Sequence, residues 1–240
     1  MNEQALQQLI RARKSSRGLF DENRAIDPAV LRSILEAAAW APTAHNMQNF
    51  EIVVVDDKSV LKTLSEMEST VSPVFLQESY RQLSFSEEEL RRKKTGILAD
   101  QFPPAWLTEA AQRGEFCPPP AKLGEAVRRG PVLLLILYDP SRRAPASEGD
   151  FLGVMSLGFM LENLWLTAAA QGVGVHIVSA FGNEPLSGKV KELLGIPPAL
   201  SLTLGCRLGY PVKDDDRPRV RRDLEDFVSY NRYGEKSAGK

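Results

Sequence analysis

The sequence predicts an α+β (α/β) fold, a three-layer sandwich in which helices flank one central mixed sheet. Short runs rich in apolar and β-branched residues alternate with segments of helical periodicity. Residues 131–138 (PVLLLILY) are apolar throughout, which is typical of a strand buried on both faces. The chain has 240 residues and can bury a substantial core, so we expect a single domain over residues 1–240.

The first part of the chain predicts two helices, a strand and a third helix. Residues 3–13 carry apolar side chains at helical spacing. Asp27-Pro28 starts the second helix, because a capping side chain is followed by proline at the first helical position. Ala41-Pro42 ends that helix, since a residue before proline resists the helical conformation. Residues 50–55 (FEIVVV) predict a buried strand, and residues 58–67 predict a helix.

The second part predicts a long central helix and further strands. Asp150 is expected to cap a helix that runs to Gln171 and ends at Gly172. Residues 173–179 and 200–208 predict strands, separated by a helix over residues 185–194.

Residues 65–130 are interrupted by prolines and match no motif. Glu87–Lys94 is a charged helical piece within them. We expect an inserted helical excursion at about 65–130, which serves as a lid or arm; the alternative is a solvated surface segment.

Composition excludes several classes of protein. Thirty Lys and Arg and 31 Asp and Glu give a net charge of −1. We therefore expect no general electrostatic attraction to nucleic acid or to an anionic membrane. Residues 151–170 approach membrane-spanning length, but Glu162 and Asn163 lie in the middle of the stretch, where a charge is costly in lipid. We therefore expect a buried helix of the protein core. Two distant cysteines and the absence of a signal sequence predict a cytoplasmic protein with reduced thiols. Two histidines without a ligand cluster predict no metal site.

Two basic clusters could each hold a phosphate. Arg13-Lys14-Ser15-Ser16-Arg17 combines three cations with two hydroxyls. Arg217, Arg219 and Arg221 alternate, so they share a face if the chain is extended there. The alternatives are a solvated charge run and a charged loop balanced by residues 214–216.

Two loops are suited to a planar ligand. Residues 41–50 (APTAHNMQNF) concentrate polar side chains that can read the edge of a heterocycle. Residues 174–182 are rich in small side chains that let backbone approach a ligand. The alternatives are an ordinary loop and a strand end that turns into a loop.

In their order and spacing, these segments resemble the nitroreductase family of FMN-dependent NAD(P)H oxidoreductases. RKSSRGLF at 13–20 resembles its opening motif, and APTAHNMQNF resembles its A-P-S/T-x-x-N-x-Q-P motif. LGYP at 208–211, followed by Arg-x-Arg ahead of Leu224-Glu225, resembles its closing stretch. The resemblance covers residues 8–64 and 131–234. It implies a nitroreductase-like sandwich that forms an intertwined homodimer.

The resemblance also implies which residues bind FMN. The phosphate and ribityl chain would contact Arg13, Lys14 and Ser15, with Arg17 nearby. Arg219 and Arg221 would close on the phosphate from the other side, with Arg217 as the alternative if the register slips. The partner subunit would cover the flavin ring with Pro42, Thr43, Ala44 and Asn46, with Gln48 behind them. The pyrimidine side of the ring would face backbone at Ile177, Val178, Ser179 and Ala180.

The implied activity is hydride transfer from NADH or NADPH, a transient reductant, through FMN to nitroaromatic, quinone or similar flat, electron-poor acceptors by a ping-pong mechanism. No Rossmann G-x-G-x-x-G motif is present, which fits a reductant that only visits the flavin. No catalytic side chain is assigned, although His45 lies in a loop from which it could protonate a substrate. Asn49 replaces the usual proline, and Ser179-Ala180 replaces a Glu-Gly pair of some members.

The sequence leaves three alternatives open. The chain could be a specialised enzyme of the same fold, of the dehalogenase, azoline-oxidising or flavin-degrading type. It could be a non-catalytic flavin-binding or storage protein. It could also be a flavin-free module that holds another phosphate compound.

Overall fold

The computed structural model describes residues 3–145, 148–213 and 216–236, and the chain divides into two compact units. Unit 1 comprises residues 1–69 and 121–215, and unit 2 comprises residues 70–120 and 216–240. Unit 2 therefore joins most of the expected excursion to the C-terminal segment. The single domain over residues 1–240 stays a prediction.

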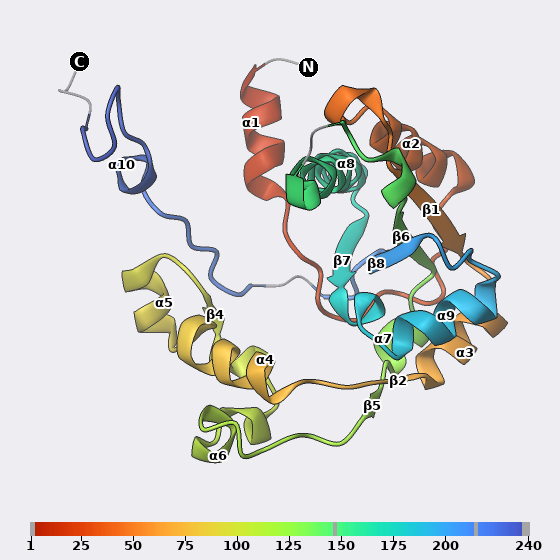
Figure 1. The fold of residues 1–240 in the computed structure, drawn as a ribbon, viewed down its shortest axis with the longest axis horizontal. Coiled ribbons are helices and arrows are strands. Elements are labelled where there is room, and N and C mark those ends of the chain that lie inside the picture. Colours follow the sequence, from red (N-terminus) through yellow and green to blue (C-terminus); the bar gives the residue numbers. More distant parts are fainter. Residues whose placement is uncertain (1–2, 146–147, 214–215, 237–240) are drawn as a thin grey trace. The chain divides into compact units, whose positions relative to one another are not determined.

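Unit 1 is built on a four-stranded sheet with the order β1-β6-β8-β7 (Figure 1). All three pairings in this sheet are antiparallel. The expectation of a mixed sheet is therefore wrong for these four strands. An isolated parallel bridge joins Ser15 to Val175 at the outer edge of β7. The strands are β1 (Phe50–Val55), β6 (Val132–Tyr138), β7 (Gly174–Val178) and β8 (Ser201–Gly209).

Helices cover both faces of this sheet, which confirms the predicted three-layer fold class. On one face, α2 (Pro28–Ala39) and α8 (Phe151–Ala170) pack on a cluster that contains Leu134 and Ile136. On the other, α3 (Lys58–Glu66), α7 (Glu125–Arg128) and α9 (Leu186–Leu194) pack on a cluster that contains Leu133 and Leu135. Because strand residues alternate in direction, β6 supplies both clusters and is buried on both faces as predicted.

The predicted helices and strands of unit 1 are confirmed to within two residues or so at most boundaries. The side chain of Asp27 accepts a hydrogen bond from the amide of Ala29 at 2.7 Å, and Pro28 is the first residue of α2. The helix stops at Ala39, before Ala41-Pro42. The other elements of unit 1 are α1 (Glu3–Ala12), η1 (Ala44–Asn46), β2 (Glu68–Ser69), β5 (Ala121–Lys122), η5 (Pro140–Arg142), η6 (Glu148–Asp150) and η7 (Ser179–Gly182).

Two predictions about unit 1 were wrong in detail. The strand at 50–55 is an edge strand rather than a buried one: β6 pairs with one side of it, and Val54 is 37% exposed. Asp150 precedes α8 but does not cap it with its side chain. Its carboxylate instead accepts a hydrogen bond from the hydroxyl of Tyr138, and its φ of 54° is left-handed. The other carboxylate oxygen is buried with no hydrogen-bond partner among the described residues, so the side chain is turned to Tyr138 and not to the amides of the helix end.

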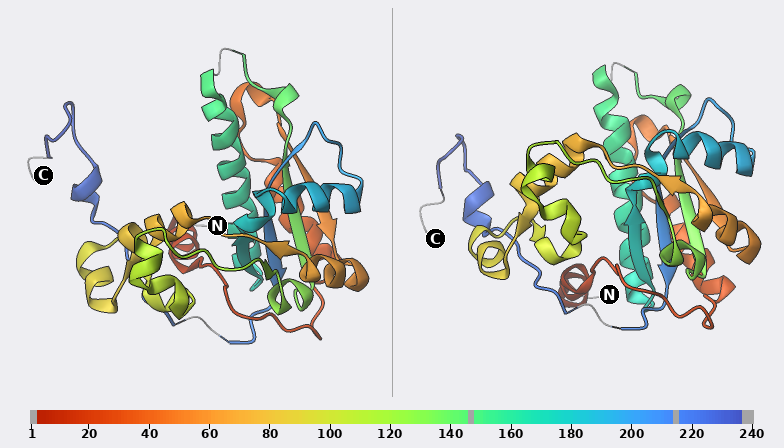
Figure 2. Two further views of the ribbon diagram at one scale, coloured as in Figure 1. Left: turned by 60° about the horizontal axis from the view of Figure 1, so that its bottom comes forward. Right: turned by 90° about the horizontal axis from the view of Figure 1, so that it is seen from below.

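Helix α8 runs along one face of the sheet (Figure 2) and has two different sides. One side is buried against α2 and the sheet, with Met160, Leu164 and Ala168 fully covered. Among the described residues, α8 is the one helix whose length and composition would suffice to cross a membrane, criteria that a core helix of a globular protein also meets. The large apolar residues exposed on its other side are Phe151, Leu152, Val154, Met155 and Phe159.

Unit 2 has short elements and a small apolar cluster. Phe85, Leu90 and Leu98 form this cluster, and Val220 from the C-terminal segment packs against it. An ion pair between Lys94 and Asp223 also joins the two parts of the unit. The elements are α4 (Pro73–Glu78), η2 (Ser79–Leu83), β3 (Ser84–Phe85), α5 (Glu87–Lys93), β4 (Ile97–Leu98), η3 (Ala99–Gln101), η4 (Pro104–Leu107), α6 (Glu109–Gln112) and α10 (Leu224–Phe227).

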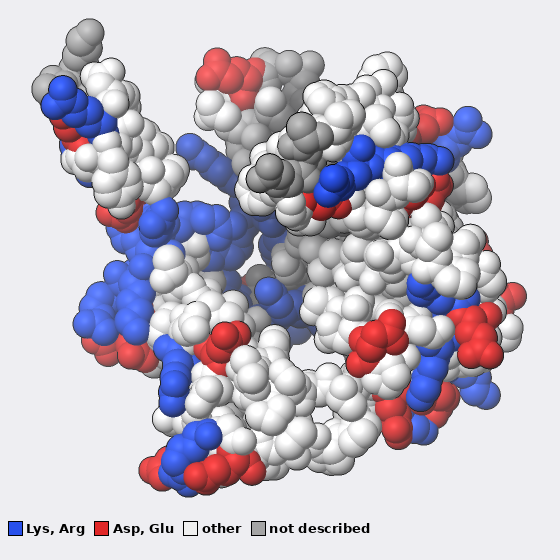
Figure 3. Space-filling view, in the orientation of Figure 1, with Lys and Arg blue, Asp and Glu red and all other residues white. Residues whose placement is uncertain are grey.

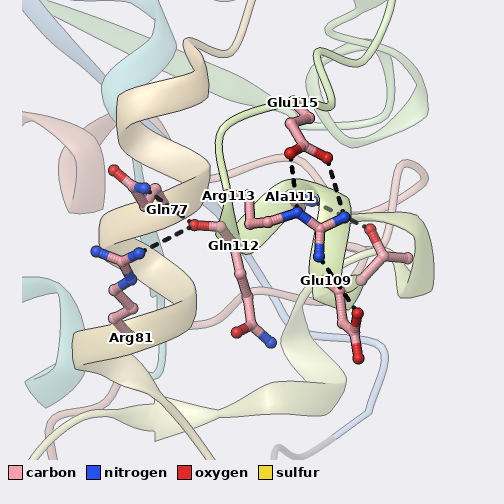
Figure 4. A network of polar contacts seen from close by, with 8 residues as sticks. Gln77, Arg81, Glu109, Ala111, Gln112, Arg113 and Glu115 are labelled. Carbon is pink, nitrogen blue, oxygen red and sulfur yellow. Dashed lines mark hydrogen bonds and ion pairs between the residues drawn. The ribbon is translucent and has the colours of Figure 1, made fainter.

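Polar contacts at the surface hold much of unit 2 together. The carbonyl oxygen of Gln112 accepts hydrogen bonds from Gln77 at 2.9 Å and from Arg81 at 3.4 Å (Figure 4). The guanidinium of Arg113 lies between the carboxylates of Glu109 and Glu115. Basic side chains gather over α5 (Figure 3). Unit 2 therefore combines one small apolar cluster with ion pairs and hydrogen bonds at its surface.

Candidate functional site

The first basic cluster lies against the outer edge of β7. The amide of Ser16 donates a hydrogen bond to the carbonyl of Val175 at 2.9 Å, next to the bridge from Ser15. Gly174 makes this approach possible, because a Cβ at that position would lie 2.5 Å from the Ser16 hydroxyl oxygen. Backbone contacts thus fix residues 13–17 to the sheet.

Helix α8 positions the start of this cluster. The indole nitrogen of Trp165 donates to the carbonyl of Lys14 at 3.2 Å. The guanidinium carbon of Arg13 lies 4.8 Å from the centre of the same indole ring, which is a cation–π contact. Nε of Arg13 lies 3.5 Å from a carboxylate oxygen of Glu162. The helix therefore orients Arg13 while it also partly balances the charge.

A buried arginine supports the cluster from within the fold. Arg207 is 1% exposed, and its guanidinium donates to the carbonyl of Gly18 at 3.0 Å. It also lies 3.1 Å from Nδ1 of His176 and 4.8 Å from the ring centre of Phe20. Because arginine only donates, Nδ1 accepts and the histidine proton resides on Nε2. Burial lowers the pKa of Arg207 to about 10.

Arg207 is not among the residues predicted for the site. A signal was present, because this arginine is the one charged residue in the predicted strand at 200–208. A charge inside a buried strand requires partners, so it points to a structural or functional contact. Here those partners are the chain that leaves the basic cluster and the strand that carries His176.

The outer edge of β7 offers backbone groups beside the basic cluster. The carbonyl of Val175 points outward to Ser16. Alternate residues of a strand direct their backbone groups to the same edge, so Ile177 faces outward as well. Val178 ends the strand, and Ser179 and Ala180 begin the turn η7. The structure therefore brings the basic cluster and the 177–180 segment together on one edge.

The 42–48 loop is held in an unusual backbone conformation. His45, Asn46 and Gln48 have φ angles of 51°, 54° and 45°, in the left-handed region. Such conformations cost free energy in residues other than glycine and cluster at functional sites. The Thr43 hydroxyl accepts from the amide of Gln48 at 3.1 Å, and the amide of Ala44 donates to the hydroxyl of Ser156 at 3.2 Å. Some of the polar side chains of this loop therefore stabilise the conformation of the loop itself.

Asn49 lies at the base of this loop. It is 2% exposed, and its backbone carbonyl accepts a hydrogen bond from the amide of Asp139 at 3.0 Å. The residue that replaces the usual proline is therefore buried between two chain segments in this protomer.

Within one protomer the basic cluster and the 42–48 loop lie toward opposite ends of the sheet. Val175 is level with Val132, while the loop leads into Phe50, which pairs with Tyr138; the two ends of β6 are about 20 Å apart. On α8, Ser156 and Trp165, which contact the two segments, are separated by roughly 13 Å of helix. The two segments do not form one compact pocket within a protomer.

The second basic cluster belongs to unit 2. Arg219 and Arg221 are exposed, Arg217 is partly buried, and Arg221 donates to the carbonyl of Val220 at 2.7 Å. The convergence of these arginines with Arg13 on one phosphate stays a prediction.

Other reactive groups are few. Cys117 is exposed and Cys206 is buried, and both are free thiols, as the sequence predicted. Burial raises the pKa of Cys206 to about 12. No group of three His, Cys, Asp or Glu that could hold a metal occurs in the described part of the chain.

Comparison with known proteins supports the resemblance. The model of the nitroreductase family matches residues 10–210. A NADH dehydrogenase of Thermus thermophilus is 27% identical over 203 residues, which cover 85% of each chain. A NADPH-flavin oxidoreductase of Vibrio harveyi is 30% identical over 90 residues, 38% of this chain and 35% of that protein.

Solved structures share the fold. A Bacteroides fragilis nitroreductase with bound FMN superposes with a TM-score of 0.59 at 18% identity and covers 96% of this chain and 100% of its own. An FMN-dependent nitroreductase of Clostridium difficile gives a TM-score of 0.57 at 17% identity, with 94% and 98% covered. These similarities agree with the predicted three-layer sandwich.

Proposed function

We propose that this chain, which belongs to the nitroreductase family, is an FMN-dependent oxidoreductase that uses NADH or NADPH to reduce flat, electron-poor acceptors such as nitroaromatics and quinones. Relatives named NADH dehydrogenase and NADPH-flavin oxidoreductase support the redox class. Structural neighbours that contain FMN support the cofactor. We further propose that the protein works in the cytoplasm.

The observation that carries the proposal is the bridge between the basic cluster and the edge of β7. It sets cations and hydroxyls beside an outward-facing strand edge. A flavin mononucleotide needs both, because its phosphate requires cations and its pyrimidine edge requires backbone donors and acceptors. We assign the phosphate and ribityl chain to Arg13, Lys14, Ser15 and Arg17, closed by Arg219 and Arg221, or by Arg217 in place of Arg221. We assign the pyrimidine edge to backbone at Ile177, Val178, Ser179 and Ala180.

A second copy of the chain would complete the site. The 42–48 loop lies away from the basic cluster of its own protomer, so we assign Pro42, Thr43, Ala44, Asn46 and Gln48 to the flavin of the partner subunit. The exposed apolar side of α8 is suited to the homodimer interface. Gly158 lies on this side, and a Cβ there would meet nothing within 4 Å in one protomer. A glycine at that position lets another backbone approach closely.

FMN supplies hydride transfer when it is bound, and a shared slot for reductant and acceptor corresponds to ping-pong kinetics. The chain's own residues bind and orient the cofactor and limit the access of water. We assign no side chain to proton transfer. His45 is exposed on the loop and is the residue to test for that role.

The proposal is tested with the purified protein by a visible spectrum and anaerobic mixing with NADPH or NADH. We expect a flavin absorption band that bleaches rapidly with at least one reductant and returns when a quinone is added. Flavin that neither reductant bleaches would indicate a storage protein. A colourless protein that cannot be reconstituted with FMN would contradict the proposal as a whole.

A further inference from the structure

Unit 1 contains a cavity of about 690 Å³ at the end of the sheet where β6 begins, lined by residues from the apolar clusters of both faces. Four segments surround it: residues 22–31, the start of α3, the end of α7 and the start of β6. Its volume lies in the range of small-molecule sites, roughly 300–1,000 Å³. None of the residues assigned to FMN lines it. The cavity therefore needs an explanation of its own.

We propose that this cavity is a second ligand site, which takes a small organic anion with a compact or flat apolar body and a single carboxylate. The charge of its lining and the nature of its inner wall carry this proposal, and neither depends on bound flavin.

Most charges at the cavity are already paired. Arg129 binds both carboxylate oxygens of Glu22 at 2.8 and 3.1 Å. Arg128 binds Glu125 in the same way at 2.6 and 2.9 Å. These two pairs cancel, so their guanidinium groups are not available to hold a phosphate dianion.

Two lysines supply the remaining positive charge. Lys58 and Lys62 are one turn apart on α3, and in the described ranges no carboxylate lies within ion-pair distance of either ammonium. Asp56 is the remaining acid of the lining. With Glu125, the partner of Arg128, included, four cations face three carboxylates, which leaves a net charge of about +1. The pKa of Glu22 is lowered, first by its hydrogen bond with Arg129 and further by the charges of Arg129, Arg128 and Lys58. This balance suits a monoanion, which two ammonium groups can bind without a fixed fork geometry.

The inner wall is apolar. Ile26, Leu61 and Val132 line the cavity and are 7%, 2% and 4% exposed. Pro28 and Pro131 add rigid apolar surface beside them. A ligand with an apolar body would cover this wall while its carboxylate stayed at the lysines, a combination typical of binding sites for small organic acids.

The test uses the purified, 15N-labelled protein and the probe 1-naphthoate, with neutral 1-naphthamide as the matched control. We expect 1-naphthoate to shift the backbone amides of Ile26, Leu61, Lys62 and Val132, and 1-naphthamide to bind more weakly. The double variant Lys58→Gln/Lys62→Gln should weaken naphthoate binding by about three- to tenfold, because two exposed charges are removed. Lys58→Arg/Lys62→Arg should keep the affinity. Lys189→Gln, an exposed lysine on α9 outside the cavity, should leave it unchanged.

Three results would overturn the inference: equal binding of the two probes, unchanged affinity in the Lys→Gln double variant, or amide shifts confined to other parts of the protein. The visible spectrum is recorded during the same titration. A change in the flavin band without shifts at the cavity would place the probe in the acceptor slot and would also count against the second site. Because the amide shifts do not depend on flavin turnover, a failure of the proposed enzymatic function is seen separately.

Discussion

The two units of this chain are stabilised in different ways. Unit 1 has two apolar clusters, one on each face of a four-stranded sheet, and β6 contributes to both. Unit 2 has a small cluster of Phe85, Leu90 and Leu98 and two-residue strands, and both units carry exposed ion pairs. Exposed ion pairs contribute little to stability, whereas buried apolar side chains contribute most of it. The comparison suggests a rigid frame that carries the basic cluster and a less stable unit that carries the C-terminal arginines.

The largest effect is expected from truncation at the centre of the frame. Leu134 is 0% exposed, so Leu134→Ala should lower the free energy of unfolding by about 2–5 kcal/mol. Chemical denaturation followed by circular dichroism measures this change. Val54→Ala on the exposed edge strand is the matched control and should cost less than about 1 kcal/mol. Equal effects of the two substitutions would show that the sheet core does not dominate the stability.

A smaller and local effect is expected in unit 2. Leu90 is 2% exposed within the small cluster, so Leu90→Ala should loosen residues 70–120 and 216–236 together, because Val220 packs on the same cluster. Hydrogen exchange should quicken in both segments and stay unchanged in β6. Faster exchange in β6 to the same extent would mean that the two units unfold as one.

A substitution of Gly158 on the exposed side of α8 distinguishes a solvent-exposed helix from a dimer interface, because the two cases predict opposite effects. Gly158→Ala in a helix exposed to water should raise stability by up to about 1 kcal/mol, since alanine favours the helix. If a second copy packs there, the added methyl group should weaken the dimer instead. We expect weaker dimers in sedimentation measurements over a range of concentrations. A stabilised protein with unchanged association would remove α8 from the interface.

The smallest effect concerns the cap of α3. The Asp57 carboxylate accepts hydrogen bonds from the Ser59 hydroxyl and from the amides of Val60 and Ser59, which lower its pKa below the ordinary value. A lowered pKa in the folded state means that the stabilisation is present above the ordinary pKa of aspartate and is lost as the pH falls through the lowered value. Asp57→Ala should lower Tm by about 2–4 °C at pH 7.

The pH dependence is the decisive part of that experiment. The difference in Tm between Asp57→Ala and the wild type should shrink as the pH falls below about 4. Asp56→Ala, a substitution of the preceding exposed aspartate outside the cap, serves as the control. A difference that persists at low pH would show that the charge of the cap is not responsible.

Most helices and strands of unit 1 could be predicted from the sequence, because each is specified by residues that are close together in the chain. The apolar run of β6, the Asp27-Pro28 start of α2 and the apolar stretch of α8 with Gly172 behind it are each continuous in the sequence. In unit 2 the predicted helical piece Glu87–Lys94 is confirmed by α5. The pairing of β3 with β4 could not be predicted, because each contributes only two residues. The contact of Asp150 could not be predicted either, since its partner Tyr138 lies at the end of β6, twelve residues earlier in the chain.

The candidate site was readable in part. The residue types of the basic cluster and of the 42–48 loop suggested a ligand, and their order suggested the family. The contact of Ser16 with Val175 and the support from Arg207 depend on chain segments that meet only in the folded protein. No local pattern contains that information, although the single charge in the strand at 200–208 was a clue.

The central claim is that each flavin site combines the basic cluster of one subunit with the 42–48 loop of the other. Subunit complementation tests it most directly. One variant carries Arg13→Ala and Lys14→Ala, and the other carries Ala44→Trp, which fills the space over the ring; each homodimer should bind FMN poorly. Mixed dimers, purified through two different tags, should bind half the FMN of the wild type, because one of their two sites has both native parts. Mixed dimers that bind no more FMN than the two parents would contradict the account.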